Sequence, residues 1–156
     1  MRRGDTKEVD DMSVFSSFDI SATGMTAQQT RTDIIAQNIA NANSTRDANG
    51  NIYKRKMVVF SEKSFPSFSD TLAQATGTVG KGVTVSKIVE DGSEGNKVYD
   101  PSHPDADEDG YVTYPNVNIV TEMTDMIDAS RSYEANVTAL NSTKSMALKA
   151  LDIGKA

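Results

Sequence analysis

The sequence contains no cysteine and no tryptophan, and only 6% of its 156 residues are aromatic. Without cysteine, disulfides, thiolate catalysis and cysteine zinc sites are excluded. Hydrophobic residues make up 37% of the chain, which is less than one well-filled core needs. We therefore expect contacts between chains to supply part of the stability.

Positive charge and long hydrophobic runs are also scarce. The formal net charge of −6 argues against nucleic acid as a partner, because a sequence-independent nucleic-acid binder needs a basic face. No apolar run approaches the ~20 residues that span a bilayer. No segment near the start resembles a secretory signal peptide. The sequence thus predicts neither membrane insertion nor a cleaved signal.

Motifs that carry catalysis are missing as well. No Gly-x-Ser-x-Gly elbow and no P-loop occurs. His103, the one histidine, lies between Ser102 and Pro104 in a turn-rich segment, which is a poor setting for a general base or a metal ligand. We predict no catalytic residue, no cofactor and no enzyme activity.

Glycine and proline divide the chain into three parts. All four prolines and seven of the ten glycines lie between Ser44 and Asn116. This distribution predicts an α+β fold, with long N- and C-terminal helices paired as a coiled coil and a small β-rich middle domain. The expected divisions are a disordered extension at 1–11, an N-terminal segment and helix at 12–43, a β-rich outer domain at 44–116 with a mobile loop at 61–80, and a C-terminal helix at 117–156.

The first eleven residues, Met1 to Asp11, are charged and have almost no apolar side chains. We expect Met12 to be the natural start, so that the residues before it are an alternative start or an added remnant. A genuine disordered tail is the other interpretation.

Local signals place the elements within these parts. The N-terminal helix is predicted to begin between Ser21 and Gly24, with Ser21 or Thr23 as its cap, and to run to about Asn43. Asn49-Gly50 is a tight-turn signal. Alternating apolar residues predict strands at Tyr53–Phe60 and Lys81–Val89, with short edge strands at Lys97–Tyr99 and Tyr111–Tyr114.

The last forty or so residues predict one long helix, because neither glycine nor proline occurs from Asn116 to Ile153. At ~1.5 Å per residue this helix would be about 50 Å long. Apolar or small residues recur along it at alternating steps of four and three, as in a coiled coil. The members of this seam are Ile119, Met123, Met126, Ser130, Tyr133, Val137, Leu140, Lys144, Ala147 and Leu151.

Two long helices and a thin middle domain cannot bury both helix faces within one chain, so we expect packing between copies. Packing inside a single chain is the alternative for each residue taken alone. Asn38, Asn41, Asn136 and Asn141 lie beside the seam and could fix its register. The predicted assembly interface consists of Phe18, Met25, Ile35, Asn38, Ile39, Asn41, Met123, Tyr133, Asn136, Val137, Leu140 and Leu151.

An acidic segment, Asp105-Ala-Asp107-Glu-Asp109-Gly110, fits the first half of a calcium loop. Its twelfth position is Asn116 instead of a bidentate glutamate, so an EF-hand is disfavoured. Asp105, Asp107 and Asp109 remain weak candidates for a surface cation. The favoured interpretation is a solvated acidic turn between two short strands.

Three separated segments resemble the flagellar axial proteins, the family of rod and hook subunits. The first comprises Ser21-Ala-Thr-Gly-Met-Thr-Ala-Gln-Gln and Ile35-Ala-Gln-Asn-Ile-Ala-Asn-Ala-Asn43, in which Asn-Ile-Ala-Asn is the hallmark run. The second is Ser130-Arg-Ser-Tyr-Glu-Ala-Asn-Val-Thr-Ala-Leu-Asn141, continued by Lys144-Ser-Met-Ala-Leu-Lys. The third is Gly110-Tyr-Val-Thr-Tyr-Pro-Asn-Val-Asn118. The resemblance spans residues 12–156 and leaves out residues 1–11.

The resemblance implies a structural subunit of the proximal rod of the bacterial flagellar basal body. Such a subunit is exported by the flagellar type III apparatus without signal cleavage, and it polymerises into a helical tube in the periplasm that transmits torque. Its partners would be copies of itself, neighbouring rod subunits and the export apparatus. The alternatives are another rod or hook subunit and, in a different class, a weak calcium-binding module through residues 105–110.

Overall fold

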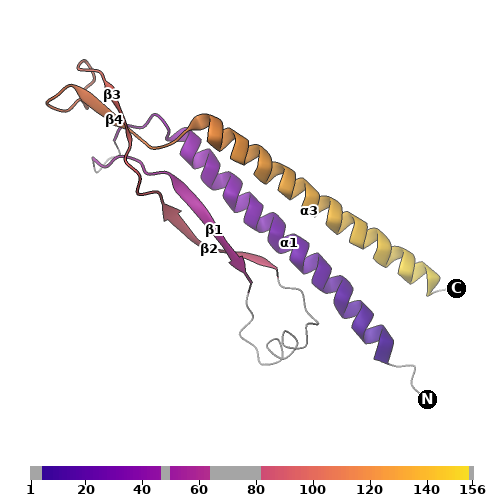
Figure 1. Cartoon of the computed structure of the whole chain (residues 1–156). Helices are drawn as coiled ribbons and strands as arrows, with labels where there is room; N and C mark the ends of the chain where they lie inside the picture. Colours follow the sequence, from indigo (N-terminus) through magenta and orange to yellow (C-terminus); the bar gives the residue numbers. More distant parts are fainter. Residues whose placement is uncertain (1–4, 47–49, 64–81, 155–156) are drawn as a thin grey trace. The chain divides into compact units, whose positions relative to one another are not determined.

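The computed structural model describes residues 5–46, 50–63 and 82–154, with side chains from residue 16 onward. It has two long helices, α1 (Asp5–Ala40) and α3 (Ile119–Ile153), and two two-stranded sheets (Figure 1). This content confirms the predicted α+β class. The strand pairs are β1 (Lys56–Glu62) with β2 (Val83–Glu90), and β3 (Asn96–Tyr99) with β4 (Tyr111–Tyr114). Within the described ranges no helix is long and apolar enough to cross a membrane.

Helix α1 begins at Asp5, so the predicted start between Ser21 and Gly24 was wrong. Gly24 lies inside the helix, where a glycine costs only about 1 kcal/mol relative to alanine, and a long helix tolerates that cost. The Thr23 hydroxyl donates back to the Ile20 carbonyl at 2.8 Å instead of capping a helix start. Residues 5–11, expected within a disordered extension, are therefore helical, whereas residues 1–4 lie outside the described residues.

Local hydrogen bonds lie at the end of α1 and at the start of α3. α1 ends at Ala40, slightly before the predicted end at Asn43, and the Asn41 side chain donates to the Gln37 carbonyl at 2.8 Å. Asn118 caps α3, because its Oδ1 accepts hydrogen bonds from the backbone N–H groups of Val120 and Thr121. α3 then runs to Ile153, as the absence of glycine and proline predicted.

The strands lie close to their predicted positions, with shifted ends. β1 begins at Lys56 instead of Tyr53 and extends to Glu62, into the segment expected to be a mobile loop. Just before the strand, the Arg55 N–H donates to Asn116 Oδ1 at 3.2 Å. The rest of that loop, residues 64–81, lies outside the described residues, as does Asn49 of the predicted turn. Gly50 has a φ of 81°, which suits a turn.

The chain divides into two compact units. The first unit combines Met1–Gln29, Phe60–Val85 and Arg131–Ala156, and the second combines Thr30–Val59 and Ser86–Ser130. Each unit therefore contains part of α1, part of α3 and part of the β1–β2 pair. Each thus joins segments that are far apart in the sequence.

In the first unit, α1 lies close to the start of β2 and to α3. The Val83 N–H donates to the Thr23 hydroxyl at 3.2 Å, and a Cβ placed on Gly82 would collide with that hydroxyl. A Cβ on Gly24 would lie 2.9 Å from the Asn136 side-chain oxygen. Asn136 is held in place because its Nδ2 donates to the Ser132 carbonyl at 2.8 Å. The two glycines thus permit two close approaches that a larger residue would prevent.

In the second unit, β3 and β4 pair antiparallel, with Val98 opposite Val112 and Tyr99 opposite Tyr111. The Val112 side chain is buried, whereas Tyr99 and Tyr111 make an exposed edge-to-face contact at 5.3 Å between ring centroids. This small hairpin has one covered side chain and little core of its own.

The close approach of Gly24 to Asn136 can be tested with a double-mutant cycle. Gly24→Ala alone gains helix propensity but forces the Asn136 side chain out of its place. In an Asn136→Ala background the same change should raise the free energy of unfolding by about 1 kcal/mol. We expect a coupling of about 1–3 kcal/mol between the two positions in urea unfolding. Additive effects would contradict the close approach.

Candidate assembly site

The predicted assembly residues fall into three groups by exposure. Ile35 and Asn38 are buried within their own chain. Met123, Tyr133 and Leu151 are exposed. The remaining seven are half-buried: Phe18, Met25, Ile39, Asn41, Asn136, Val137 and Leu140. The assembly role of the set stays a prediction, but its exposed members are the ones that a neighbouring subunit can reach.

The most buried positions of α3 do not belong to the predicted seam. Glu122 and Ala129 are the buried residues of this helix, and neither was assigned to the seam. Six seam members are exposed: Ile119, Met123, Ser130, Tyr133, Lys144 and Leu151. The difference arises because Glu122, a charged residue that sequence patterning places outside, is bound by polar partners inside the second unit.

Asn38 is the first of these partners, and its amide group makes four hydrogen bonds. Its Nδ2 donates to the Lys56 carbonyl at 2.8 Å and to Glu122 Oε2 at 2.9 Å. Its Oδ1 accepts from the Lys56 N–H at 2.9 Å and from the Tyr53 hydroxyl at 2.9 Å. Both donors and both acceptor sites of the amide are therefore used. The side chain binds the first residue of β1 as a neighbouring strand would.

Arg55 is the second partner of Glu122. Its Nε lies 2.6 Å from Glu122 Oε1, and the side chain of Glu122 is 1% exposed. The other end of the guanidinium lies 3.5 Å from Asp125, which also pairs with Arg31 at 2.9 Å. A buried carboxylate is costly unless charge and hydrogen bonds compensate it. Here the guanidinium binds one carboxylate oxygen and the Asn38 amide binds the other.

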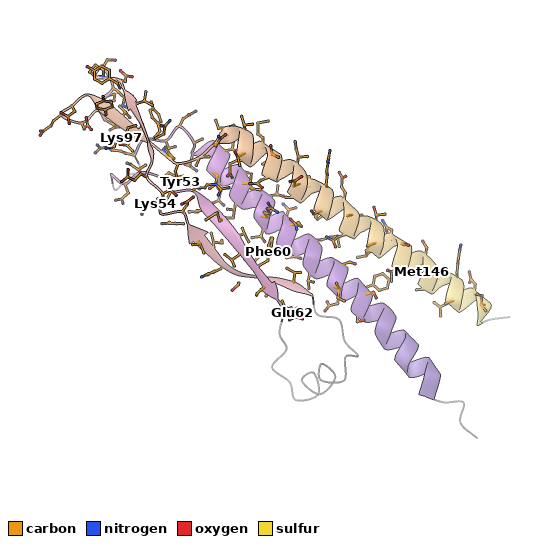
Figure 2. All side chains as sticks on the ribbon, in the orientation of Figure 1. Tyr53, Lys54, Phe60, Glu62, Lys97 and Met146 are labelled. Atoms are coloured by element: carbon orange, nitrogen blue, oxygen red, sulfur yellow. The ribbon has the colours of Figure 1, made fainter. Side chains whose placement is uncertain are left out.

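Tyr53 completes this cluster, and its position is labelled in Figure 2. Burial is the main cause that raises the pKa of Tyr53, and the negative charges of Glu122 and Glu90 raise it further. The phenol therefore stays protonated and keeps donating to Asn38. The Lys56 ammonium lies 5.6 Å from the ring centroid. We call the six residues Arg31, Asn38, Tyr53, Arg55, Glu122 and Asp125 the polar junction.

Sequence reasoning found Asn38 but missed the other five members of the polar junction. A signal for Arg31 was present, because Arg31 and Asn38 are seven residues apart and so share one face of α1. For Arg55 the signal was weaker: alternation in an extended Lys54-Arg55-Lys56 segment would place Arg55 on the face opposite its two neighbours. No local pattern indicated that Glu122 lies inside.

The acidic segment forms a turn between β3 and β4 and uses its carboxylates as hydrogen-bond acceptors. Asp107 Oδ1 accepts from the backbone N–H groups of Asp109 and Tyr111. Asp105 accepts a hydrogen bond from the Thr45 hydroxyl and lies 3.7 Å from the Arg46 guanidinium. No group of three or more carboxylate or histidine side chains in the described ranges is placed to hold a metal ion. The geometry is that of a solvated acidic turn.

Just before this turn, Asp100 stabilises the chain reversal. Its Oδ1 accepts from both the hydroxyl and the N–H of Ser102. These hydrogen bonds to the Ser102 side chain and backbone lower the pKa of Asp100. The same arrangement with Ser93 lowers the pKa of Asp91 after β2.

Large apolar side chains remain exposed along α3. In the second unit they are Ile119, Val120, Met123 and Ile127. In the first unit they are Tyr133, Met146, Leu148, Leu151 and Ile153. Met146 is labelled in Figure 2. Exposed apolar side chains in each unit are candidates for contact with another molecule.

Comparisons with known proteins show which class of protein this sequence belongs to. Residues 18–46 match the family model described as "Flagella basal body rod protein". Residues 108–153 match the model "Flagellar basal body rod FlgEFG protein C-terminal". The two matches cover both sides of the polar junction, at the end of α1 and the start of α3. They define the class as the flagellar basal-body rod proteins.

Curated relatives narrow this class to one protein family. The flagellar basal-body rod protein FlgC of Bacillus subtilis is 49% identical over 150 residues, covering 92% of this chain and 100% of the relative. FlgC of Borreliella burgdorferi is 44% identical over 91% of this chain and 98% of the relative. FlgC of Salmonella typhimurium is 41% identical over 92% of this chain and 100% of the relative. The chain belongs to the FlgC family of flagellar basal-body rod proteins.

The role of Asn38 can be tested by replacing its amide. Asn38→Asp removes both donors and places a second carboxylate beside Glu122, so we expect the free energy of unfolding to fall by about 2–4 kcal/mol. Asn41→Asp is the matched control, since the Asn41 amide bonds only the nearby Gln37 carbonyl and Ser44 hydroxyl among the described contacts. Urea unfolding measures both. Equal losses would contradict the assigned role of Asn38.

The Arg55–Glu122 pair allows a rescue test. Arg55→Met leaves a buried carboxylate without its cation and should destabilise the chain by about 3–5 kcal/mol. Adding Glu122→Gln removes the charge and should restore most of the loss. Lys63→Met is the control, because in the Lys63–Asp19 pair at 3.5 Å Asp19 is exposed and Lys63 only half-buried, so the substitution should change stability by less than about 1 kcal/mol. If the second substitution brings no recovery, burial of an ionised Glu122 is not the reason for the loss.

Proposed function

We propose that this rod subunit belongs to the proximal rod and polymerises there into a helical tube that transmits torque. The membership of the FlgC family makes it a structural subunit of the flagellar basal body. The observation that carries the finer proposal is the number of large apolar side chains of α3 that remain exposed among the described residues. Neighbouring subunits would cover them.

The proposal includes coiled-coil pairing of α1 with α3. Contacts between the two helices within each unit support it: Asn38 with Glu122 and Arg31 with Asp125 in the second, and Gly24 with Asn136 in the first. The seam members that stay exposed in the single chain, such as Met123, Tyr133 and Leu151, are available to neighbouring subunits. Many such pairs packed together would resist twist, which is the property a rod requires.

Export, partners and location follow from the same proposal. The subunit is exported by the flagellar type III apparatus without signal cleavage and assembles in the periplasm with copies of itself and with neighbouring rod subunits. It works without catalysis or a cofactor. The low content of large aromatic side chains and the absence of cysteine fit a chain that travels unfolded.

A complementation experiment tests the proposal. In a flagellated bacterium that lacks its own FlgC, the chain should restore motility and be recovered at the base of the rod in isolated basal bodies. Tyr133→Ala and Leu140→Ala should each remove about 2–4 kcal/mol of buried contact per subunit and reduce rod assembly. Glu134→Ala, at an exposed polar position of α3, is the control. Intact rods and normal motility in both variants would argue strongly against this seam.

A further inference from the structure

A recess of about 440 Å³ lies beside the start of β1 in the second unit. Its walls come from the segment after α1, from the segment that leads into β1, and from Glu90 at the end of β2. Tyr53 and Lys54, two of the residues that line it, are labelled in Figure 2. Its volume falls within the range of about 300–1,000 Å³ that is usual for ligand pockets. We call it the basic recess.

The basic recess has more positive than negative charge. Its described lining includes three bases and one acid, namely Arg46, Lys54, Lys56 and Glu90. Arg46 lies 3.7 Å from Asp105, whereas neither lysine forms an ion pair with a carboxylate among the described residues. In the whole chain, acids outnumber bases by 22 to 16. Two lysines without a carboxylate partner in so acidic a chain point to a carboxylate from outside.

The polar junction holds the two lysines in place. Asn38 accepts a hydrogen bond from the Lys56 N–H at 2.9 Å and donates one to the Lys56 carbonyl at 2.8 Å. Between the lysines, Arg55 binds Glu122 at 2.6 Å. Because side chains alternate along an extended segment, Lys54 and Lys56 fall on the side opposite Arg55. A backbone fixed in this way loses less conformational freedom when a ligand binds.

Screening favours a short ligand over an extended polyanion. At physiological ionic strength charges act over only about 8 Å, so a ligand confined to the recess interacts mainly with the local lysines. A nucleic acid or an anionic membrane would also meet the rest of a chain whose net charge is −6, and membrane surfaces usually bind clusters of about 4–8 bases. The side chains of Asn41 and Asn51 and the exposed Ile52 also line the recess. A peptide offers groups that match all of these side chains.

Acidic residues of this chain are less suited to be the ligand. Asp91, Asp100, Asp105 and Asp107 each accept hydrogen bonds from groups of their own chain. A second copy would have to break such bonds before it could place these carboxylates in the recess. An extended acidic segment of another protein has no such bonds to lose.

We propose that the basic recess binds a short acidic peptide segment of a partner protein. Its carboxylates pair with the ammonium groups of Lys54 and Lys56, and an aliphatic side chain beside them contacts Ile52. This inference goes beyond the proposed function, because it requires neither the tube nor a second copy of the chain. Failure of peptide binding would therefore leave the proposed assembly intact, and failure of assembly would leave the peptide site intact.

Fluorescence anisotropy with a fluorescein-labelled hexaglutamate peptide and the full chain tests the proposal. We expect saturable binding that Lys54→Gln/Lys56→Gln weakens about tenfold, because two charge-assisted contacts are lost. The matched control is Lys87→Gln/Lys97→Gln, which removes the same charge from two exposed lysines of the same unit that do not line the recess. It should weaken binding less than about twofold.

A second variant keeps the test decisive if the double variant unfolds. Lys54→Glu changes one exposed side chain and leaves the backbone contacts of Lys56 with Asn38 in place. It reverses a charge in the recess and should also weaken hexaglutamate binding about tenfold. Inorganic phosphate at equal ionic strength should not displace the peptide, and vesicles of phosphatidylcholine with phosphatidylglycerol should not bind the chain.

Four outcomes would overturn the proposal. The first is an equal loss of peptide binding in the two lysine pairs, and the second is displacement by phosphate or binding to the vesicles. The third is self-association of the chain that Lys54→Glu abolishes while hexaglutamate does not bind. The fourth concerns Asp47, which follows Arg46 in the sequence and lies outside the described residues. If hexaglutamate binds only after Asp47→Asn, a carboxylate of the chain itself neutralises the recess.

Discussion

Burial of the Glu122 carboxylate is the constraint on which the second unit depends. A carboxylate can leave water only where charge and hydrogen bonds replace its hydration, and here Arg55 and Asn38 provide them at 2.6 and 2.9 Å. Arg55 directly precedes β1, and Asn38 lies near the end of α1. Placing one carboxylate therefore fixes three segments at once, and the surrounding packing has to accommodate that geometry.

In this molecule several contacts within the chain are polar, whereas many large apolar side chains of α3 stay exposed. Polar contacts, from the polar junction to the Thr23–Val83 hydrogen bond, connect parts of one chain. Large apolar side chains, from Val120 to Ile153, remain on the surface of α3. In most proteins the apolar groups fill the interior and the polar groups face water. In the proposed rod, neighbouring subunits would cover these exposed apolar side chains.

The sequence was sufficient for the elements and their class, because glycine and proline punctuate the middle and are nearly absent from the flanks. It also supplied the family, through Asn-Ile-Ala-Asn and the Ser130–Asn141 and Gly110–Asn118 segments. It failed at the start of α1, which was placed between Ser21 and Gly24 with Ser21 or Thr23 as its cap, whereas the helix begins at Asp5 and contains Gly24. It failed again at Glu122, because hydrophobic periodicity treats every carboxylate as exposed. Glu122 can be buried only because Asn38 and Arg55, which are distant in the sequence, both bond to it in the folded chain.

The polar junction also has a consequence for the order of events when the chain is made. Asn38 and Arg55 precede Glu122 by 84 and 67 positions. A chain that emerges amino end first therefore presents the amide and the guanidinium long before their carboxylate partner exists. Until then the Glu122 carboxylate is absent, so it cannot link the start of β1 to the end of α1. The polar junction can form only once the start of α3 has emerged with Glu122. Until then, with most of the chain already synthesised, these segments are not held together.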